Sequence, residues 1–318
     1  MNRTSISWTD FSSNPIYAVD RETGKRGWFC EKLSPSCANC YASALNVRRG
    51  TGHDYLPENR DKVEFRLNER ELAAILRRRK PARIFMMDMG DLWHGDVPDT
   101  FIDRVFATMA LAPWHTFLLL TKRPERMREY VSSRTNENER GAAFWSRFVG
   151  QDYRPSWPLL NVHLGVSVEN QRFADERIPI LLDTPAAVHF ISAEPLLGPL
   201  NLLRWLGRGY NDGETGQFLE TGVDWVIVGG ESAGSPERRL VERCVQPWHD
   251  INMRLAVCDR CAGTGWRPKP KALAWLRSLR GQAAGTAFYF KGWGGPTPKS
   301  GGRLLDGREW NEMPGKEA

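Results

Sequence analysis

The sequence predicts an α/β fold in which about six parallel strands, covered by helices, form a barrel or partial barrel. Short, continuous apolar runs alternate with helical stretches along most of the chain, which is typical of parallel strands buried on both faces. Nearly every apolar run also ends in charged or glycine-rich residues. A small cysteine-rich insertion interrupts this pattern late in the chain.

The first half of the chain contains three predicted strands, which are Arg83–Met87, Thr116–Thr121 and Asn161–Val168. A helix is predicted to begin near Asp96, and a second begins at Pro124, directly after a strand. Ser5–Trp8 is a candidate for one further short strand. Residues 131–160 read as a polar insertion.

The second half contains three more predicted strands, which are Ala187–Ala193, Asp224–Ser232 and Thr286–Phe290. Residues 201–222 read as a second polar insertion, and a helix is predicted near Ala272–Leu279. We therefore divide the chain into a barrel over residues 1–243, a cysteine-rich insertion over 244–271, and the last helix, strand and tail over 272–318.

Polar side chains gather where the predicted strands end. They are Asp88, Asp91, Lys122, Arg123, Ser167, Glu169, Glu194, Glu231 and Lys291. In barrels the carboxyl ends of all strands converge on one active site, whereas an open sheet uses only those near its switch point. The whole series favours a shared site, although any single residue could instead be a helix cap or part of a solvated loop.

Three closely spaced thiols, Cys30, Cys37 and Cys40, precede the barrel in a C-x6-C-x2-C pattern followed by Tyr41. An iron–sulfur cubane usually takes four thiolates, so three local ligands leave one iron open to a substrate or cofactor. A zinc site completed by a distant histidine, or plain buried thiols, are the alternatives.

A second cysteine cluster contains Cys258 and Cys261 in a C-x2-C pattern followed by glycines, with Cys244 and His249 upstream. These four side chains can form a tetrahedral zinc site. A second iron–sulfur cluster and a loop of reduced thiols remain as alternatives. The basic run 267–271 follows, and zinc knuckles with basic flanks often contact nucleic acid.

The composition favours a cytoplasmic protein that binds nucleic acid. The net charge is +6 and there are 13 tryptophans, which suits phosphate contacts and base stacking, although a soluble protein with an aromatic core has the same composition. No apolar run approaches the ~20 residues that span a bilayer, and no signal peptide is visible. Six cysteines in two clusters indicate metal sites rather than disulfides.

Several short motifs carry a resemblance through nearly the whole chain. They are Ser7-Trp-Thr-Asp10, Ser34-Pro-Ser-Cys37-Ala-Asn-Cys40-Tyr41, Gly90-Asp91-Leu92, Leu120-Thr-Lys-Arg-Pro124, Gly165-Val-Ser-Val-Glu-Asn170, Ser192-Ala-Glu-Pro-Leu196, Val226-Ile-Val-Gly-Gly-Glu-Ser232, Phe290-Lys-Gly-Trp-Gly294 and Gly302–Trp310. In this order they resemble the phage-type three-Cys-motif protein family, a divergent group related to radical S-adenosylmethionine (SAM) enzymes.

The resemblance implies a partial (β/α) barrel of the radical SAM type, with a [4Fe-4S] cluster on Cys30, Cys37 and Cys40 and SAM at the open iron. The usual radical SAM spacing is C-x3-C-x2-C, so this loop departs from it. The residues expected to hold SAM are Tyr41, Asp88, Asp91, Lys122, Arg123, Ser167 and Glu169. Glu194, Glu231 and Lys291 are expected to face the substrate as catalytic residues.

The expected activity is formation of a 5′-deoxyadenosyl radical that rearranges or otherwise modifies a hypermodified nucleobase in phage DNA, as an isomerase or mutase does. Expected partners are DNA or a modified nucleotide and an electron donor such as flavodoxin or ferredoxin, in the host cytoplasm if the protein is phage-encoded. One alternative is a nucleic-acid-binding accessory protein with a structural cluster or zinc. Another is a metal-dependent nuclease that uses Asp88, Asp91, Glu194 and Glu231.

Overall fold

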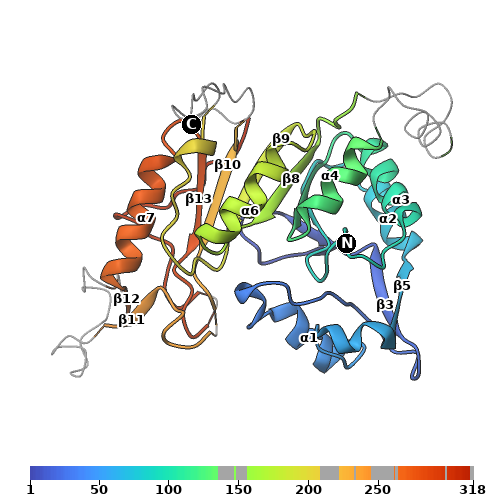
Figure 1. The fold of residues 1–318 in the computed structure, drawn as a ribbon, viewed down its shortest axis with the longest axis horizontal. Helices are drawn as coiled ribbons and strands as arrows, with labels where there is room; N and C mark the ends of the chain where they lie inside the picture. The colour runs from blue at the N-terminus through green and yellow to red at the C-terminus, as the bar shows by residue number, and fades with distance from the viewer. Residues whose placement is uncertain are drawn as a thin grey trace. The chain divides into compact units, whose positions relative to one another are not determined.

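The fold is mixed α/β, and most strands of its main sheet pair in parallel (Figure 1). The computed structural model describes residues 1–134, 147, 156–207, 222–232, 234–244, 261, 264–297 and 299–315. The main sheet contains eight strands in the order β1-β2-β6-β7-β8-β9-β10-β13. The predicted α/β class with a mostly parallel sheet is confirmed, whereas the sheet has eight strands rather than about six, and the radical SAM type of barrel stays a prediction. The chain divides into two compact units, residues 1–166 with 179–189 and residues 167–178 with 190–318.

The first unit contains β1 (Asn2–Arg3), β2 (Phe11–Ser13), β6 (Arg83–Met86), β7 (Thr116–Thr121) and most of β8 (Val162–Ser167). Strands β2, β6, β7 and β8 pair in parallel, and β1 pairs with β2 in the antiparallel sense. Their apolar side chains are almost fully buried, as at Ile84 and Phe117. The predicted strands at 83–87, 116–121 and 161–168 are therefore confirmed.

Three helices of the first unit follow the expected alternation, namely α2 (Glu69–Arg77), α3 (Asp99–Ala110) and α4 (Pro124–Ser132). Helix α3 buries Ile102, Val105 and Phe106. It begins three residues later than predicted, because Pro98 precedes its first turn and Asp96 instead pairs with Arg60.

A small lobe of the first unit carries the cysteine loop. Strands β4 (Arg26–Gly27), β3 (Ile16–Asp20) and β5 (Val63–Leu67) form a three-stranded antiparallel sheet, and α1 (Tyr41–Arg49) begins directly after Cys40. A buried cluster of Ala18, Phe29, Ala42, Tyr55, Val63 and Met89 forms the core of this lobe, and Cys30 and Cys40 pack against it. The sequence did not predict this sheet.

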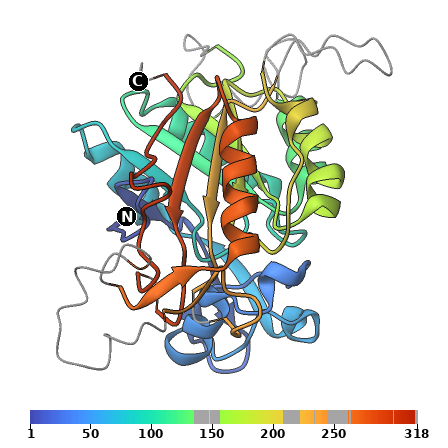
Figure 2. The same ribbon diagram turned by 90° about the vertical axis from the view of Figure 1, so that its left-hand side faces the viewer.

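The second unit contains β9 (Val188–Ala193), β10 (Trp225–Gly229) and β13 (Ala287–Gly292), which pair in parallel. Helix α7 (Pro270–Gln282) runs along β10 and β13 (Figure 2). A short hairpin of β11 (Val241–Arg243) and β12 (Trp266–Pro268) precedes α7. Helix α6 (Gln171–Leu182) connects β8 to β9. The last three predicted strands and the helix near 272–279 are confirmed.

One predicted strand is wrong. Residues 5–8 contain no strand, and β2 at Phe11–Ser13 pairs with β6 instead. The apolar side chain that suggested the strand, Trp8, is buried from a turn. Most of the predicted insertions 131–160 and 201–222 lie outside the described residues. The predicted domain boundaries at 243 and 271 stay predictions.

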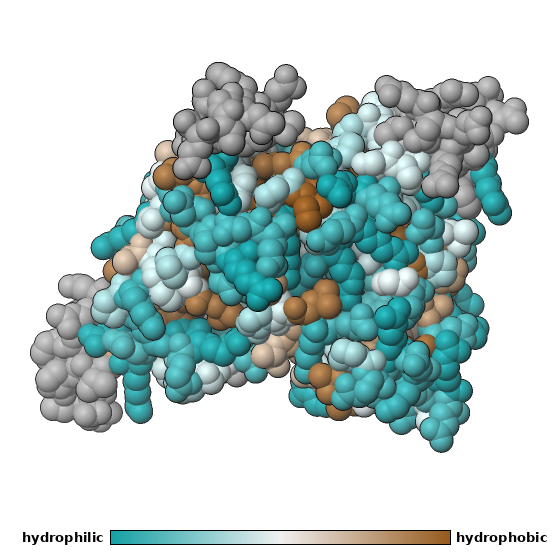
Figure 3. Space-filling view, viewed as in Figure 1, coloured by the Kyte–Doolittle hydropathy of each residue, from teal (hydrophilic) through white to brown (hydrophobic). Residues whose placement is uncertain are grey.

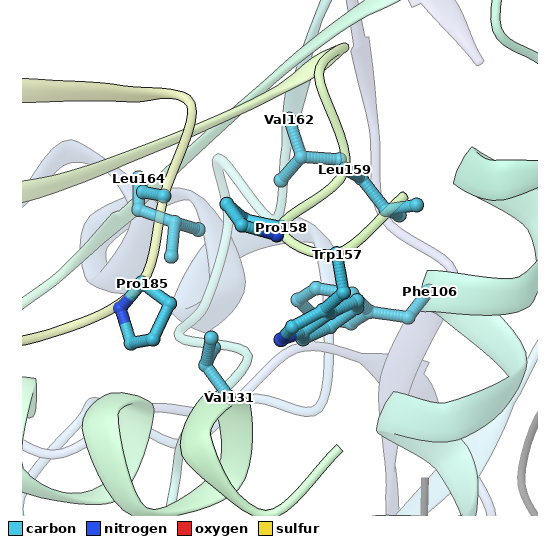
Figure 4. A pocket seen from close by; sticks show the side chains of 9 residues that line it. Phe106, Val131, Trp157, Pro158, Leu159, Val162, Leu164 and Pro185 are labelled. Carbon is cyan, nitrogen blue, oxygen red and sulfur yellow. The ribbon is translucent and has the colours of Figure 1, made fainter. Parts of the chain in front are cut away.

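A very small apolar cavity lies beside β8, lined by Phe106, Trp157, Leu164, Pro185 and neighbouring apolar residues (Figure 4). Its volume of about 10 Å³ is close to the least that admits one water molecule. Because its lining is apolar, we regard it as a packing defect of the core rather than as a ligand site.

Asn46 on α1 connects three segments of the small lobe. Its buried amide accepts hydrogen bonds from the backbone N–H groups of Trp28 and Thr51, and it donates to Thr51 Oγ1 and the His53 carbonyl. A side chain on Gly27 or Gly50 would collide with this amide. The lobe thus depends on a polar residue whose partners are all internal.

Replacing Asn46 with alanine should destabilise the first unit by about 3 kcal/mol, because buried backbone N–H groups lose their acceptor. Chemical denaturation monitored by circular dichroism measures the change. Asn39→Ala, at an exposed position of the same segment, is the matched control and should change stability by less than about 0.5 kcal/mol. Equal effects of the two substitutions would contradict this reading.

Candidate functional site

The cysteine loop is ordered by local backbone hydrogen bonds. Residues Pro35–Cys37 form one short 3-10 turn, in which Cys37 N–H donates to the Ser34 carbonyl. Cys40 N–H donates to the Cys37 carbonyl, and Cys40 is the N-cap residue that directly precedes α1. The turn and the helix start place Cys37 and Cys40 three residues apart on one bend, with Cys37 buried and Cys40 partly buried.

Two cations at the carboxyl end of β7 reach this loop. Lys122 Nζ lies 3.2 Å from Cys37 Sγ, and an Arg123 guanidinium nitrogen lies 3.6 Å from Cys30 Sγ. Both can donate to sulfur. The two residues follow β7 directly, so the sheet fixes their position relative to the thiols.

The cations act differently on the two thiols. Burial raises the pKa of Cys37, but the Lys122 charge and hydrogen bonds to the sulfur outweigh it, so that pKa lies below its ordinary value. Burial raises the pKa of Cys30 to about 12 despite Arg123. The Lys122 charge therefore stabilises the thiolate form of Cys37 relative to an ordinary cysteine, whereas burial stabilises the thiol form of Cys30.

Asp91 holds one of these cations, Arg123, in place. Its carboxylate accepts hydrogen bonds from Thr121 Oγ1 at 2.8 and 2.9 Å and from Arg123 at 3.0 Å. The backbone N–H groups of Trp93 and Lys122 donate to it as well. Asp91 therefore positions Arg123, and its predicted pairing with the ammonium group of SAM stays a prediction.

Asp88 and Tyr41 lie together beside the loop. The Tyr41 hydroxyl donates to the Asp88 backbone carbonyl at 2.7 Å, and the Asn14 amide donates to the Asp88 carboxylate at 2.5 Å. Burial raises the pKa of Asp88 above its ordinary value. Tyr41 is still 57% exposed. In the first unit, direct contacts thus join Tyr41 to Asp88, Lys122 to Cys37, and Arg123 to Cys30 and Asp91.

In the second unit, Glu194 follows β9 and Lys291 lies near the end of β13. Lys291 Nζ lies 3.1 Å from Glu194 Oε1. Strand β10 runs between these two strands, and a side chain on its last residue, Gly229, would overlap the Glu194 carboxylate. The glycine therefore lets Glu194 extend across the end of β10 to the lysine.

The other predicted acids of the second unit are paired with arginines. Arg238 donates two hydrogen bonds to Glu231, at 2.7 and 2.8 Å. Arg177 lies 3.2 Å from the fully buried Glu169 and also donates to the Ser167 carbonyl. These pairs neutralise Glu231 and Glu169, so their predicted contacts with substrate and ribose stay predictions.

Two members of the second cysteine cluster meet at the base of the β11–β12 hairpin. Cys244 and Cys261 are both 4% exposed and pack against each other, and Cys244 N–H donates to the Gly265 carbonyl. His249 and Cys258 lie outside the described residues. In the basic run, Arg267 pairs with Glu242 and Lys269 donates to the Pro236 carbonyl.

The chemistry of the first thiol trio fits an iron–sulfur cluster. A cubane held by thiolates is anionic, and the lysine and arginine donors at two sulfurs suit that charge. Over the ranges that the structure describes, no group of three or more His, Cys, Asp or Glu side chains is arranged to hold a metal ion. Metal binding by Cys30, Cys37 and Cys40 therefore requires these thiols to converge further.

Sequence reasoning missed Glu31 and His94, which complete the charged network behind Cys30. Glu31 lies 3.4 Å from Arg123 and 3.3 Å from His94 Nε2. His94 is fully buried against Phe29 and Phe65, and its Nδ1 accepts from the Asp96 N–H at 3.2 Å. The only available signal was the position of Glu31 directly after Cys30.

Burial, followed by the Arg123 charge, lowers the pKa of His94 to about 4. Between this value and its ordinary pKa, the unfolded chain binds a proton that the folded chain does not, so stability must fall as the pH is lowered. We expect the free energy of unfolding to drop by about 2–3 kcal/mol between about pH 7 and about pH 4.5 through this residue.

Denaturation curves at the two pH values, with wild type and His94→Gln, measure this contribution. In His94→Gln, the fall in the free energy of unfolding that is due to His94 should disappear. The pH dependence that is due to the other titratable groups should remain. An identical pH dependence in both proteins would show that His94 is not held neutral by its surroundings.

The comparisons with known proteins identify a family but no characterised relative. The profile of a family described as "Protein of unknown function (DUF5131)" matches residues 3–254, which is more than half of the chain. No curated protein and no solved structure matches this chain. The chain therefore belongs to the DUF5131 family.

Proposed function

We propose that this protein is a radical SAM-type enzyme that binds a [4Fe-4S] cluster through Cys30, Cys37 and Cys40. The observation that carries the proposal is the pair of cations after β7, with Lys122 Nζ 3.2 Å from Cys37 Sγ and Arg123 3.6 Å from Cys30 Sγ. Two plain buried thiols would not need two charged donors, whereas thiolates that carry a cluster would.

With SAM bound at an open iron, such a cluster supplies reductive cleavage of SAM and a 5′-deoxyadenosyl radical. This chain's own residues would hold the reactants. Lys122 and Arg123 balance the charge on the sulfurs, and Asp91 fixes Arg123. The exposed Tyr41 ring offers an apolar surface for the adenine, and Asp88 beside it offers a hydrogen-bonding carboxyl group.

We assign the substrate-facing role to Glu194 and Lys291. The Lys291 side chain is 41% exposed, which is more than the arginines that pair with Glu231 and Glu169. Such a pair can orient a polar substrate and can give or take a proton. Glu231 and Glu169 are held by arginines, so we give them a positioning role.

The proposed substrate is a modified nucleobase in DNA, reached after the base is flipped out of the duplex. The support is compositional, namely the net charge of +6 and the many tryptophans. The face drawn in Figure 3 is mostly hydrophilic, with small scattered apolar groups. In the parts of the chain that the structure describes, no helix is long and apolar enough to cross a membrane. Zinc at Cys244 and Cys261 remains part of the proposal for the second cluster.

Substitution of single cysteines tests the cluster assignment. After anaerobic reconstitution with iron and sulfide, Cys37→Ser should lose most of its cluster iron and visible absorption, because one of only three protein ligands is gone. Cys244→Ser, which changes an equally buried cysteine of the other cluster, is the matched control and should retain both signals.

Iron and sulfide analysis together with absorption spectra gives the result. Full retention of the cluster by Cys37→Ser would remove the assignment. Equal loss in both variants would indicate that serine substitution disrupts folding rather than ligation, and circular dichroism of the apoproteins separates that outcome from loss of a ligand.

A further inference from the structure

A pocket of about 420 Å³ opens in the first unit, away from the cysteine loop. Its lining includes Arg3, Arg78 and Lys80, together with Asp10 and Phe11. The volume lies within the range of small-molecule sites. Apart from Asp10, which belongs to the motif Ser7-Trp-Thr-Asp10, these residues lie outside the motifs identified in the sequence, and the proposed radical chemistry does not use them.

The pocket lies at the amino ends of β2 and β6. Phe11 begins β2, and Ala82 in the lining immediately precedes Arg83, the first residue of β6. The cysteine site is built from residues that follow the carboxyl ends of β6 and β7. Four residues of β6 separate the two levels, which corresponds to roughly 13 Å. A ligand here would be bound without taking part in chemistry at the thiols.

The charge of the pocket is positive. Asp10 is its one carboxylate, and Arg83 donates to it from both its backbone and its guanidinium. Burial raises the pKa of Asp10, but these hydrogen bonds outweigh it and keep the group ionised. Arg3, Arg78 and Lys80 make no side-chain hydrogen bond or salt bridge with the described residues. The Arg78 charge also helps to lower the pKa of Asp10. The lining thus carries three cations and one carboxylate, and its net charge is positive.

Arg78 is held in place for binding. Its guanidinium stacks on the Phe11 ring at 4.3 Å, and a stacked guanidinium directs its N–H groups outward from its edge. Its Nε is buried and lacks a hydrogen-bond partner within the described part of the chain. The Arg78 carbonyl accepts from Trp114 Nε1 at 2.7 Å, which fixes the backbone. A buried, oriented donor that lacks an acceptor among the described residues is suited to donate to a bound anion.

We propose that this pocket binds a phosphate group, either a diester of a nucleic acid strand or the phosphates of a free nucleotide. A planar, stacked arginine with two nearby cations matches phosphate geometry and charge. The inference does not depend on the cluster or on the proposed radical reaction, because the pocket residues are separate from that site.

Binding to the full-length protein tests the proposal with two probes. A fluorescein-labelled single-stranded DNA oligonucleotide is followed by fluorescence anisotropy, and inorganic pyrophosphate is followed by calorimetry. Arg78→Gln should weaken binding at least about tenfold, since a charge-assisted contact is lost, and Lys80→Gln should weaken it about threefold. Arg79→Gln removes the same charge from a neighbour that stacks on Trp114 instead, and it should change binding less than about twofold.

If the substitutions weaken the binding of pyrophosphate in this way, the pocket is a site for the phosphates of free nucleotides. If they weaken only the binding of the oligonucleotide, the pocket is a site for the DNA backbone. Binding of neither probe, or equal losses in Arg78→Gln and Arg79→Gln, would overturn the proposal. If Arg78→Gln fails to fold in thermal denaturation, the exposed Lys80 carries the test through the same comparison with Arg79→Gln.

Discussion

The contacts from Lys122 and Arg123 to the cysteine sulfurs are the interactions on which the candidate site depends. They link a loop with little regular structure to the carboxyl end of β7, which is fixed by pairing on both sides. Asp91 and Glu31 hold Arg123 from the other direction. The charged side chains after β7 therefore interact directly with the thiols, although the thiols come from a separate lobe.

In both units, a buried carboxylate positions a cationic side chain. Asp91 positions Arg123 in the first unit, and in the second Glu231 and Glu169 are satisfied by Arg238 and Arg177. A buried charge is tolerated only with such a partner. The Glu194–Lys291 pair differs because its lysine is more exposed, and for this reason we assign it the contact with substrate.

The barrel strands could be predicted because each is a continuous apolar run, as in Phe117-Leu-Leu-Leu120, and burial on both faces leaves a strong signal. Strand β2 has only three residues and two serines, so its pairing with β6 carries no such signal. The small lobe was missed because Asn46 and the glycines beside it stabilise it through specific hydrogen bonds. Strand ends predicted the gathering of Asp91, Lys122 and Arg123. The arginine partners Arg177 and Arg238 follow shortly after the motifs that contain Glu169 and Glu231 but belong to neither motif, so no pattern in the sequence marked them as partners.

The measurement that tests the central claim most directly uses protein purified without oxygen, reconstituted with iron and sulfide, and reduced with dithionite. The electron paramagnetic resonance spectrum is recorded with and without SAM, and 5′-deoxyadenosine is assayed in the same samples. The account predicts a reduced [4Fe-4S] signal that SAM perturbs, together with formation of the nucleoside. A cluster whose spectrum ignores SAM, or the absence of any cluster, would contradict it.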